Sequence, residues 1–194
     1  LPTYSGYKPD VNPGIDMFFA VAAYRYGHSG INSIYTRLDS NNEALQQGHL
    51  LLRDVYFNPS YLFDGGIESL LRGLCNELEG EIDPKMVDDL RHFVEGIAQD
   101  LAAMDIQRGR DVGLPSYNDA RRYFGLSVAS NWPDVTNDYQ LQQTLQSIYG
   151  TVDKLDAWVG GLAENKKSGI TLGPLFAASI REQFIRSRDG DRFW

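Results

Sequence analysis

Two side chains near the start of the chain have the types and spacing needed to hold an iron-bearing, anionic cofactor. Arg25 and His28 lie three residues apart in a stretch whose apolar spacing predicts a helix, so they share a face. A neutral imidazole is a common ligand of haem iron, and an arginine one turn away can pair with a haem propionate. Taken alone, however, the pair is better explained by a histidine packed at the end of a helix.

A second segment, residues 104–111, supplies a partner for such a ligand. An axial histidine usually donates its other ring nitrogen to an acceptor, and Asp105 is a candidate for that acceptor. Arg108, three residues further on, could hold the other end of a haem or pair with an acidic neighbour. Alone, this segment also fits a solvated, charged end of a helix.

Composition narrows the class of protein. The 194 residues fit one domain or a large piece of one, and 42% hydrophobic with 23% charged residues is typical of a globular chain. The net charge of -8 disfavours nucleic acid and anionic membranes as partners. The longest apolar run, 17–24, is far shorter than the roughly 20 residues of a membrane span. Cys75 is the only cysteine, which excludes a cysteine-built zinc site.

The elements that would position these residues are predicted to be mainly α-helical, with few and short strands. Asn12-Pro13 is typical of a helix start, and Asp64 and Asp83-Pro84 indicate two more. The helix after Pro84 carries its apolar residues on one face and is expected to continue toward Arg110. Ranges 12–29, 64–78, 84–110, 116–125, 139–149, 152–159 and 174–185 are the expected helices.

Together the two segments resemble the animal haem peroxidase family. The resemblance follows nearly the whole chain in order, and Asp105-Ile106-Gln107-Arg108-Gly109-Arg110-Asp111 is its most specific part. The matching motifs are residues 1–4, 7, 11–13, 23–29, 37–39, 64–67, 71–74, 105–111, 113–115, 117–118, 158–164, 173–175 and 188–194.

The resemblance implies a set of cofactor-contacting residues. It makes His28 the axial, proximal ligand of the haem iron, and Asp105 the residue that acts on the iron through His28. It places two arginines near the propionates and two apolar residues at the haem face or edge. The implied contacts of haem b, whose covalent modification stays open, are Arg25, His28, Leu101, Met104, Asp105 and Arg108.

Two positions depart from the family pattern. Mammalian members typically have Asn where Asp105 stands, and many members have His where this chain has Val112. A carboxylate pulls the imidazole proton more strongly than an amide does. The departures indicate a divergent branch, for example a bacterial one.

The resemblance also implies what lies outside this chain. Residues 1–194 would be the C-terminal, proximal part of a single haem peroxidase domain of mainly α-helical fold. The distal catalytic residues and a calcium loop are expected upstream, on the N-terminal half of the same peroxidase or on a companion chain. His49 and His92 lack the distal context and are interpreted as structural or surface residues. The family further implies a secreted or extracellular location.

The predicted function is a haem-dependent peroxidase that uses hydrogen peroxide to oxidise small donors such as halides or phenols. The first alternative is a fatty-acid dioxygenase of the same superfamily, which works through a tyrosyl radical near the haem. The second is a non-enzymatic adhesion module that kept the fold. Some of the 11 tyrosines could act as radical sites, but nothing in the sequence marks which.

Overall fold

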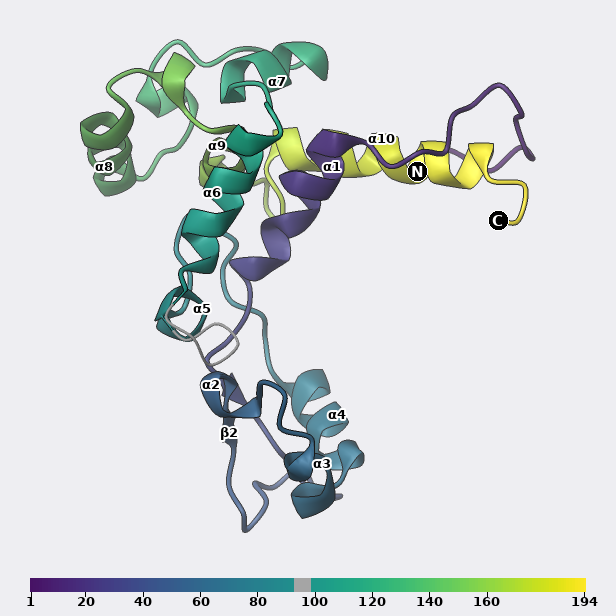
Figure 1. Cartoon of the computed structure of the whole chain (residues 1–194), viewed down its shortest axis with the longest axis vertical. Helices are drawn as coiled ribbons and strands as arrows, with labels where there is room; N and C mark the ends of the chain where they lie inside the picture. Colours follow the sequence, from purple (N-terminus) through teal and green to yellow (C-terminus); the bar gives the residue numbers. More distant parts are fainter. Residues whose placement is uncertain (93–98) are drawn as a thin grey trace. The chain divides into compact units, whose positions relative to one another are not determined.

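The computed structural model describes residues 1–92 and 99–194 and is mainly helical, as predicted. It contains two compact units, drawn with their elements labelled in Figure 1. The first unit comprises Leu1–Gly27 and Asp105–Trp194, and the second comprises His28–Met104.

A short, wholly buried helix forms the core of the first unit. This helix, α9 (Ala157–Ala163), contacts α7 (Tyr117–Tyr123) and α10 (Pro174–Gly190). Two adjacent glycines in α9 let the aromatic rings of its neighbours lie directly against its backbone. A Cβ on Gly160 would fall 2.3 Å from the ring of Tyr117, and one on Gly161 would fall 2.2 Å from the ring of Phe176.

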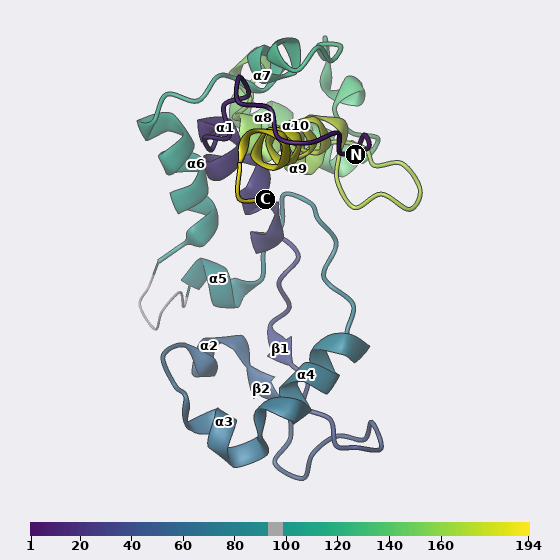
Figure 2. The ribbon, with the colours of Figure 1, turned by 90° about the vertical axis from the view of Figure 1, so that its right-hand side faces the viewer.

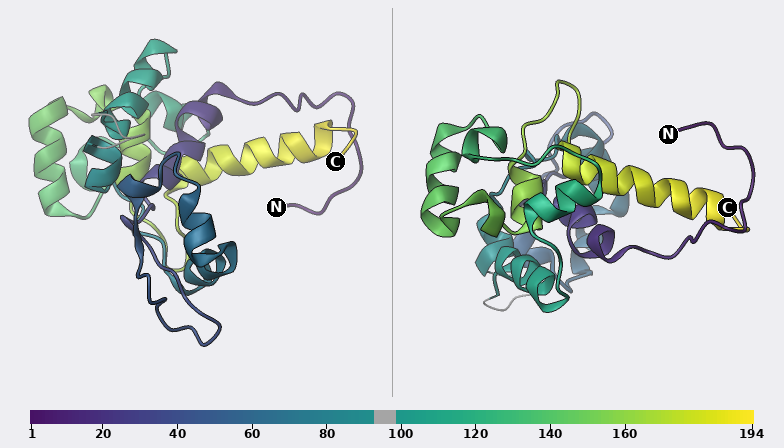
Figure 3. Two further views of the ribbon diagram at one scale, coloured as in Figure 1. Left: turned by 60° about the horizontal axis from the view of Figure 1, so that its bottom comes forward. Right: turned by 90° about the horizontal axis from the view of Figure 1, so that it is seen from above.

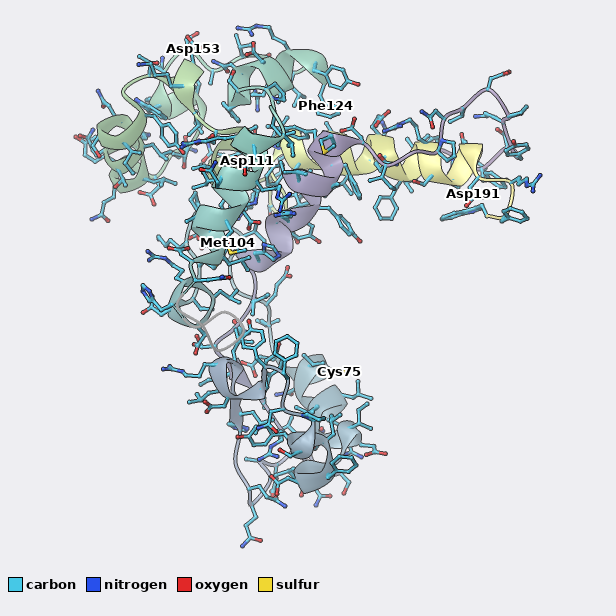
Figure 4. All side chains as sticks on the ribbon, in the orientation of Figure 1. Cys75, Met104, Asp111, Phe124, Asp153 and Asp191 are labelled. Carbon is cyan, nitrogen blue, oxygen red and sulfur yellow. The ribbon has the colours of Figure 1, made fainter. Side chains whose placement is uncertain are left out.

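The remaining elements of the first unit surround this core. Phe18 on α1 packs against Phe124, which follows α7, with ring centroids 5.5 Å apart (Figure 4). The other helices are α1 (Met17–Val21), α6 (Leu101–Asp111, from Asp105 onward), α8 (Tyr139–Tyr149) and the 3-10 turns η1 (Ala23–His28, up to Gly27), η3 (Trp132–Asp134) and η4 (Val152–Lys154).

The N-terminal segment runs alongside the C-terminal half of α10 (Figure 3). The amide of Lys8 donates to the carbonyl of Asp189 at 2.7 Å, and its ammonium group pairs with the Asp189 carboxylate at 2.8 Å. Arg188 donates to the carbonyl of Pro2 and to the carboxylate of Asp189. The hydrogen bonds from Arg188 and Lys8 hold the pKa of Asp189 below its ordinary value, so the carboxylate stays ionised and the segment stays attached.

The second unit carries a small antiparallel sheet (Figure 2). Strands β1 (Ile34–Tyr35) and β2 (Leu50–Leu51) pair beside α4 (Ile67–Asn76), and a Cβ on Gly73 of α4 would fall 1.7 Å from the carbonyl oxygen of Thr36. Arg37 is buried and donates to the carbonyls of Gln47 and Gly48. The unit also contains α2 (Leu52–Val55), α3 (Ser60–Gly65) and α5 (Asp88–His92).

Two predicted helix starts were wrong because the expected capping residues make other bonds. The Asn12 side chain accepts from the amide of Gly14, and the helix begins only at α1, where Asp16 accepts from the first-turn amides. Asp64 pairs with Arg37 at 3.0 Å instead of capping a helix. Gly66, with a φ of 73°, separates α3 from α4, so the single helix expected over 64–78 is two.

The long helix expected after Pro84 was also wrong in its bounds. It begins at Asp88 as α5, and its predicted apolar residues Phe93, Val94 and Ile97 lie outside the described residues. α6 has its own start at Leu101, where Asp100 accepts from the amide of Ala103. The predicted helices 116–125, 139–149 and 174–185 are confirmed, whereas 152–159 is η4 followed by α9.

We predict that Gly161→Ala lowers the free energy of unfolding by about 1–3 kcal/mol, because the added methyl group would overlap the Phe176 ring. Gly109→Ala is the matched control on α6: its Cβ would meet only Leu114 at 3.4 Å, so a gain of about 0.5–1 kcal/mol is expected. Urea denaturation of both variants measures the difference. Equal stabilities would contradict the close packing of α9.

Candidate functional site

The proposed iron ligand and its neighbouring arginine lie on one short element. η1 covers Ala23–His28, so this stretch is a 3-10 helix and not the α-helix that the spacing predicted. In a 3-10 helix, residues three positions apart lie on the same side. The spacing that brings Arg25 and His28 onto one face is therefore kept, in a tighter form. Both residues are partly exposed.

Arg25 forms an ion pair with Asp105. Its Nη1 donates to the Asp105 Oδ1 at 2.8 Å, across 80 positions of sequence. The Asp105 side chain is fully buried, whereas that of Arg25 is 31% exposed. A buried carboxylate is costly unless a cation and hydrogen bonds compensate it, and Arg25 supplies a cation at this position.

From the sequence we predicted that Arg25 pairs with a haem propionate, and we did not predict its ion pair with Asp105. A guanidinium carries five N–H donors; Nη1 of Arg25 donates to Asp105, and its Nε donates to the carbonyl of Ala20 at 3.4 Å. Both roles are therefore compatible. No spacing rule could reveal a pair 80 residues apart, although an acidic and a basic residue in the two candidate segments were a usable signal.

The candidate residues of α6 follow one face of the helix. They are spaced at i, i+3, i+4 and i+7, which is the repeat of a single helical face. Leu101 is half-buried, Met104 is 46% exposed and Arg108 is exposed. Within residues 1–92 and 99–194, the guanidinium of Arg108 makes no hydrogen bond or ion pair, so it is available to an anionic group. Met104 is labelled on this helix in Figure 4.

The six candidates are divided between the two units. The first unit brings Arg25 and Asp105 together, and the hydrogen bond between His28 and Asp105 stays a prediction. The second unit contributes His28, Leu101 and Met104, and the first contributes Arg25, Asp105 and Arg108.

The donor set fits a cofactor that brings most of its own metal ligands. Among the described residues, no group of three or more His, Cys, Asp or Glu side chains could hold a metal ion. Haem iron takes four nitrogens from its ring and needs only one axial residue from the protein. A histidine that shares one side of η1 with an arginine would therefore suit a haem.

A buried carboxylate at the C-terminal end of α9 was missed by sequence reasoning. Glu164 Oε1 accepts the hydroxyl of Tyr117 at 3.0 Å, and its Oε2 accepts the amide of Leu175 at 2.7 Å. Arg121 forms an ion pair with the same carboxylate. Burial raises the pKa of Glu164, while these bonds and the charge of Arg121 oppose that rise. Burial likewise raises the pKa of Tyr117 above its ordinary value.

A similar group lies at the N-terminal end of α9. Asp156 accepts the hydroxyl of Tyr149 at 2.9 Å and two bonds from Arg110, at 3.1 and 2.7 Å. Burial, followed by the bond to Asp156, raises the pKa of Tyr149. Both ends of α9 thus carry a carboxylate that binds one tyrosine and one arginine.

A family model described as animal haem peroxidase matches residues 1–194, the whole chain. The chain belongs to the animal haem peroxidase family. Membership implies a haem cofactor, and it agrees with the resemblance derived from the motifs around His28 and Asp105.

Curated relatives match over the same length. The chain is 42% identical to peroxinectin A of Dictyostelium discoideum over 198 residues, which cover 100% of this chain and 37% of that protein. It is 41% identical to a peroxidasin homolog of Caenorhabditis elegans, with 98% and 15% covered, and 40% identical to thyroid peroxidase of Sus scrofa, with 98% and 22% covered. The chain therefore spans well under half the length of these relatives.

Solved structures show the same fold. Peroxidase A from Dictyostelium discoideum matches with a TM-score of 0.94 at 42% identity, covering 100% of this chain and 38% of that one. A fatty acid alpha-dioxygenase of Oryza sativa matches with a TM-score of 0.80 at 26% identity, covering 93% and 32%. The peroxidase is thus the better match of the two by both measures.

We predict that the Arg25–Asp105 pair stabilises the fold through direct coupling. A double-mutant cycle with Arg25→Gln and Asp105→Asn should give a coupling energy of about 1–3 kcal/mol in the free energy of unfolding, since one partner is fully buried. A parallel cycle with Arg122→Gln and Asp119→Asn is the control, because that pair is exposed on both sides and should couple by less than about 1 kcal/mol. Equal coupling in the two cycles would show that the burial of Asp105 has no effect.

Proposed function

We propose that this chain supplies the iron-ligating side of a haem-dependent peroxidase, which uses hydrogen peroxide to oxidise small donors such as halides or phenols. The observation that carries the proposal is the family match over residues 1–194. Within that match, a buried Asp105 is paired with Arg25, which lies three residues before His28 on η1. The chain thus carries both the axial ligand and the charged groups suited to a haem.

Each candidate residue has a distinct proposed part in holding haem b. His28 would ligate the iron. Asp105 would accept a hydrogen bond from the N–H group of the His28 imidazole and so fix the orientation of that ring. Arg25 and Arg108 would pair with the propionates, while Leu101 and Met104 on α6 would lie against the ring. The haem, when bound, supplies the redox chemistry with peroxide. A covalent attachment would need carboxylates that we expect outside this chain.

We infer that residues 1–194 are the C-terminal, proximal part of a single peroxidase domain. This chain covers 37% of peroxinectin A and 38% of the matching peroxidase structure, so the greater part of each relative has no counterpart here. The distal catalytic residues and any calcium site would come from the N-terminal half of the same peroxidase or from a companion chain. No helix in the described residues is long and apolar enough to cross a membrane. A secreted or extracellular location remains an expectation from the family.

A fatty-acid dioxygenase is the second candidate, because solved structures of fatty acid alpha-dioxygenases also match this chain. The peroxidase is favoured by 42% against 26% identity and by a TM-score of 0.94 against 0.80. The haem-loaded protein, combined with the distal part that we expect outside this chain, should therefore oxidise iodide or a phenol when given peroxide. Oxygen uptake with palmitate, in the absence of that activity, would instead establish the dioxygenase. An adhesion module would bind no haem.

We predict that His28→Ala abolishes the Soret band of the haem-loaded protein or changes it to that of a weakly bound haem, because the iron loses its axial nitrogen. His92→Ala is the control; this histidine lies on α5 and is largely exposed. The measurement is a haemin titration followed by absorption spectroscopy. Unchanged spectra in His28→Ala would refute the ligand assignment.

We predict opposite shifts of the iron reduction potential in two variants. Asp105→Asn should raise it, since an amide leaves the imidazole less anionic and the ferric state less stabilised. Arg25→Gln should lower it, since the positive charge that balances Asp105 is removed. Asp111→Asn, on the exposed part of α6, is the control and should leave the potential unchanged. An unchanged or lower potential in Asp105→Asn would contradict the proposal that Asp105 stabilises the ferric iron through His28.

A further inference from the structure

The hydroxyl of Tyr117 and the carboxylate of Glu164 form a hydrogen-bonded pair in the core of the first unit. Tyr117 is 0% exposed and Glu164 is 4% exposed. The hydroxyl donates to Oε1 at 3.0 Å, from α7 to the C-terminal end of α9. That distance lies within the range at which a proton passes directly from one heavy atom to another. The pair therefore has the geometry of a proton donor and its acceptor.

This geometry suits a phenol that loses one electron. A phenol becomes strongly acidic when it is oxidised, so its proton must leave at the same time, and Glu164 is the acceptor in contact. Burial raises the pKa of Tyr117, so the phenol stays protonated until the electron leaves. Burial also raises the pKa of the Glu164 carboxyl, which makes it a stronger base than an exposed glutamate.

Arg121 places a positive charge beside the Tyr117–Glu164 pair. Its guanidinium contacts the carboxylate of Glu164 and lies 3.3 Å from the hydroxyl of Tyr117. This positive charge lowers the pKa of Glu164 and so opposes the rise that burial causes. The same charge makes removal of an electron from Tyr117 harder, so only a strong oxidant would do it.

We propose that Tyr117 is a redox-active tyrosine whose oxidation is coupled to proton transfer to Glu164. Tyr117 gives one electron to a strong one-electron oxidant, its O–H bond breaks, and a new O–H bond forms on Glu164 Oε1. The products are a neutral tyrosyl radical, a neutral carboxylic acid and the oxidant reduced by one electron. An electron from a donor and the return of the proton restore the pair. The proposal rests on the proposed function for its oxidant, the haem after reaction with peroxide.

The packing of Tyr117 would protect such a radical. Its ring lies against the backbone of Gly160, where a Cβ would fall 2.3 Å from it. Its amide is bonded to the carbonyl of Leu155, so the residue is held at both ends. A buried and immobile radical cannot couple with a second radical or meet solvent reductants. Its lifetime should therefore be long.

The chain contains its own comparison in Tyr149. That hydroxyl also donates to a carboxylate, Asp156, but the acceptor side chain is 19% exposed and is held by two bonds from Arg110. Tyr149 itself is only half-buried. A radical formed there would be open to solvent and short-lived. Tyr149→Phe therefore removes a similar hydrogen bond while leaving the buried pair intact.

The first arm of the test uses the haem-loaded protein mixed with hydrogen peroxide, frozen rapidly and measured by electron paramagnetic resonance. We expect a tyrosyl radical in the unchanged protein and in Tyr149→Phe. In Tyr117→Phe the signal should fall at least about tenfold, and Glu164→Gln should slow its formation by a similar factor, because the proton acceptor is removed. Circular dichroism shows whether each variant is folded; Tyr117→Phe keeps the ring and decides the outcome if Glu164→Gln does not fold.

The second arm separates this proposal from the peroxidase function. The same protein is oxidised by light with ruthenium tris(bipyridine) and persulfate, which needs no peroxide chemistry at a haem. A long-lived tyrosyl radical that disappears only in Tyr117→Phe supports the redox role, even if peroxide produces no radical and the peroxidase function fails. If peroxide is consumed but neither arm gives a Tyr117-dependent radical, the redox role is overturned and the peroxidase function stands. A long-lived signal that persists in Tyr117→Phe also overturns it.

Discussion

The burial of α9 is the constraint on which the first unit depends. Every residue of Ala157–Ala163 is buried, so the carboxylates that flank the helix, Asp156 and Glu164, lie where ionised groups are costly. Each is compensated by an arginine and a tyrosine from another part of the chain. Gly160 in α9 lets one of these partners, Tyr117, lie directly against the helix backbone. Packing and charge compensation at α9 are thus one arrangement, which joins α6, α7, α8 and α10.

The same rule shapes the candidate haem site. Asp105 is fully buried on α6, and the structure compensates it with Arg25 from η1. The ion pair thereby links η1, which carries the proposed ligand His28, to α6, which carries the residue proposed to act on that ligand. This tie lies within one unit, whereas His28 opens the other. An arginine that spends one of its donors on Asp105 keeps others for an anionic group, so charge compensation and cofactor binding need not compete.

The sequence predicted the helical class and the later helices well, because their signals are local. Ser116 caps α7 through the amide of Asp119, and Pro174 opens α10, as the residue types indicate. The errors at Asn12 and Asp64 arose where a capping residue had a competing partner: the amide of Gly14 in one case and the distant Arg37 in the other. The site residues came from motifs, but the bonds among them did not. Neither the pairing of Arg25 with Asp105 nor that of Tyr117 with Glu164 leaves any local periodicity in the sequence.

The buried carboxylates of Asp105, Glu164 and Asp189 are each compensated in the same way, by an ion pair with an arginine. What distinguishes them is the remaining partner. Asp189 binds Lys8 and a backbone segment, which is a structural use. Glu164 accepts a hydrogen bond from the phenol of Tyr117, and Asp105 is proposed to accept one from the imidazole of His28. The phenol becomes a stronger proton donor when it loses an electron, and the imidazole does so when the iron it ligates loses one. A carboxylate that already contacts such a donor could take up the proton without rearrangement. Pairing with an arginine thus stabilises one end of α10, and in the proposed haem and tyrosine sites it would also support electron transfer near α6 and α9.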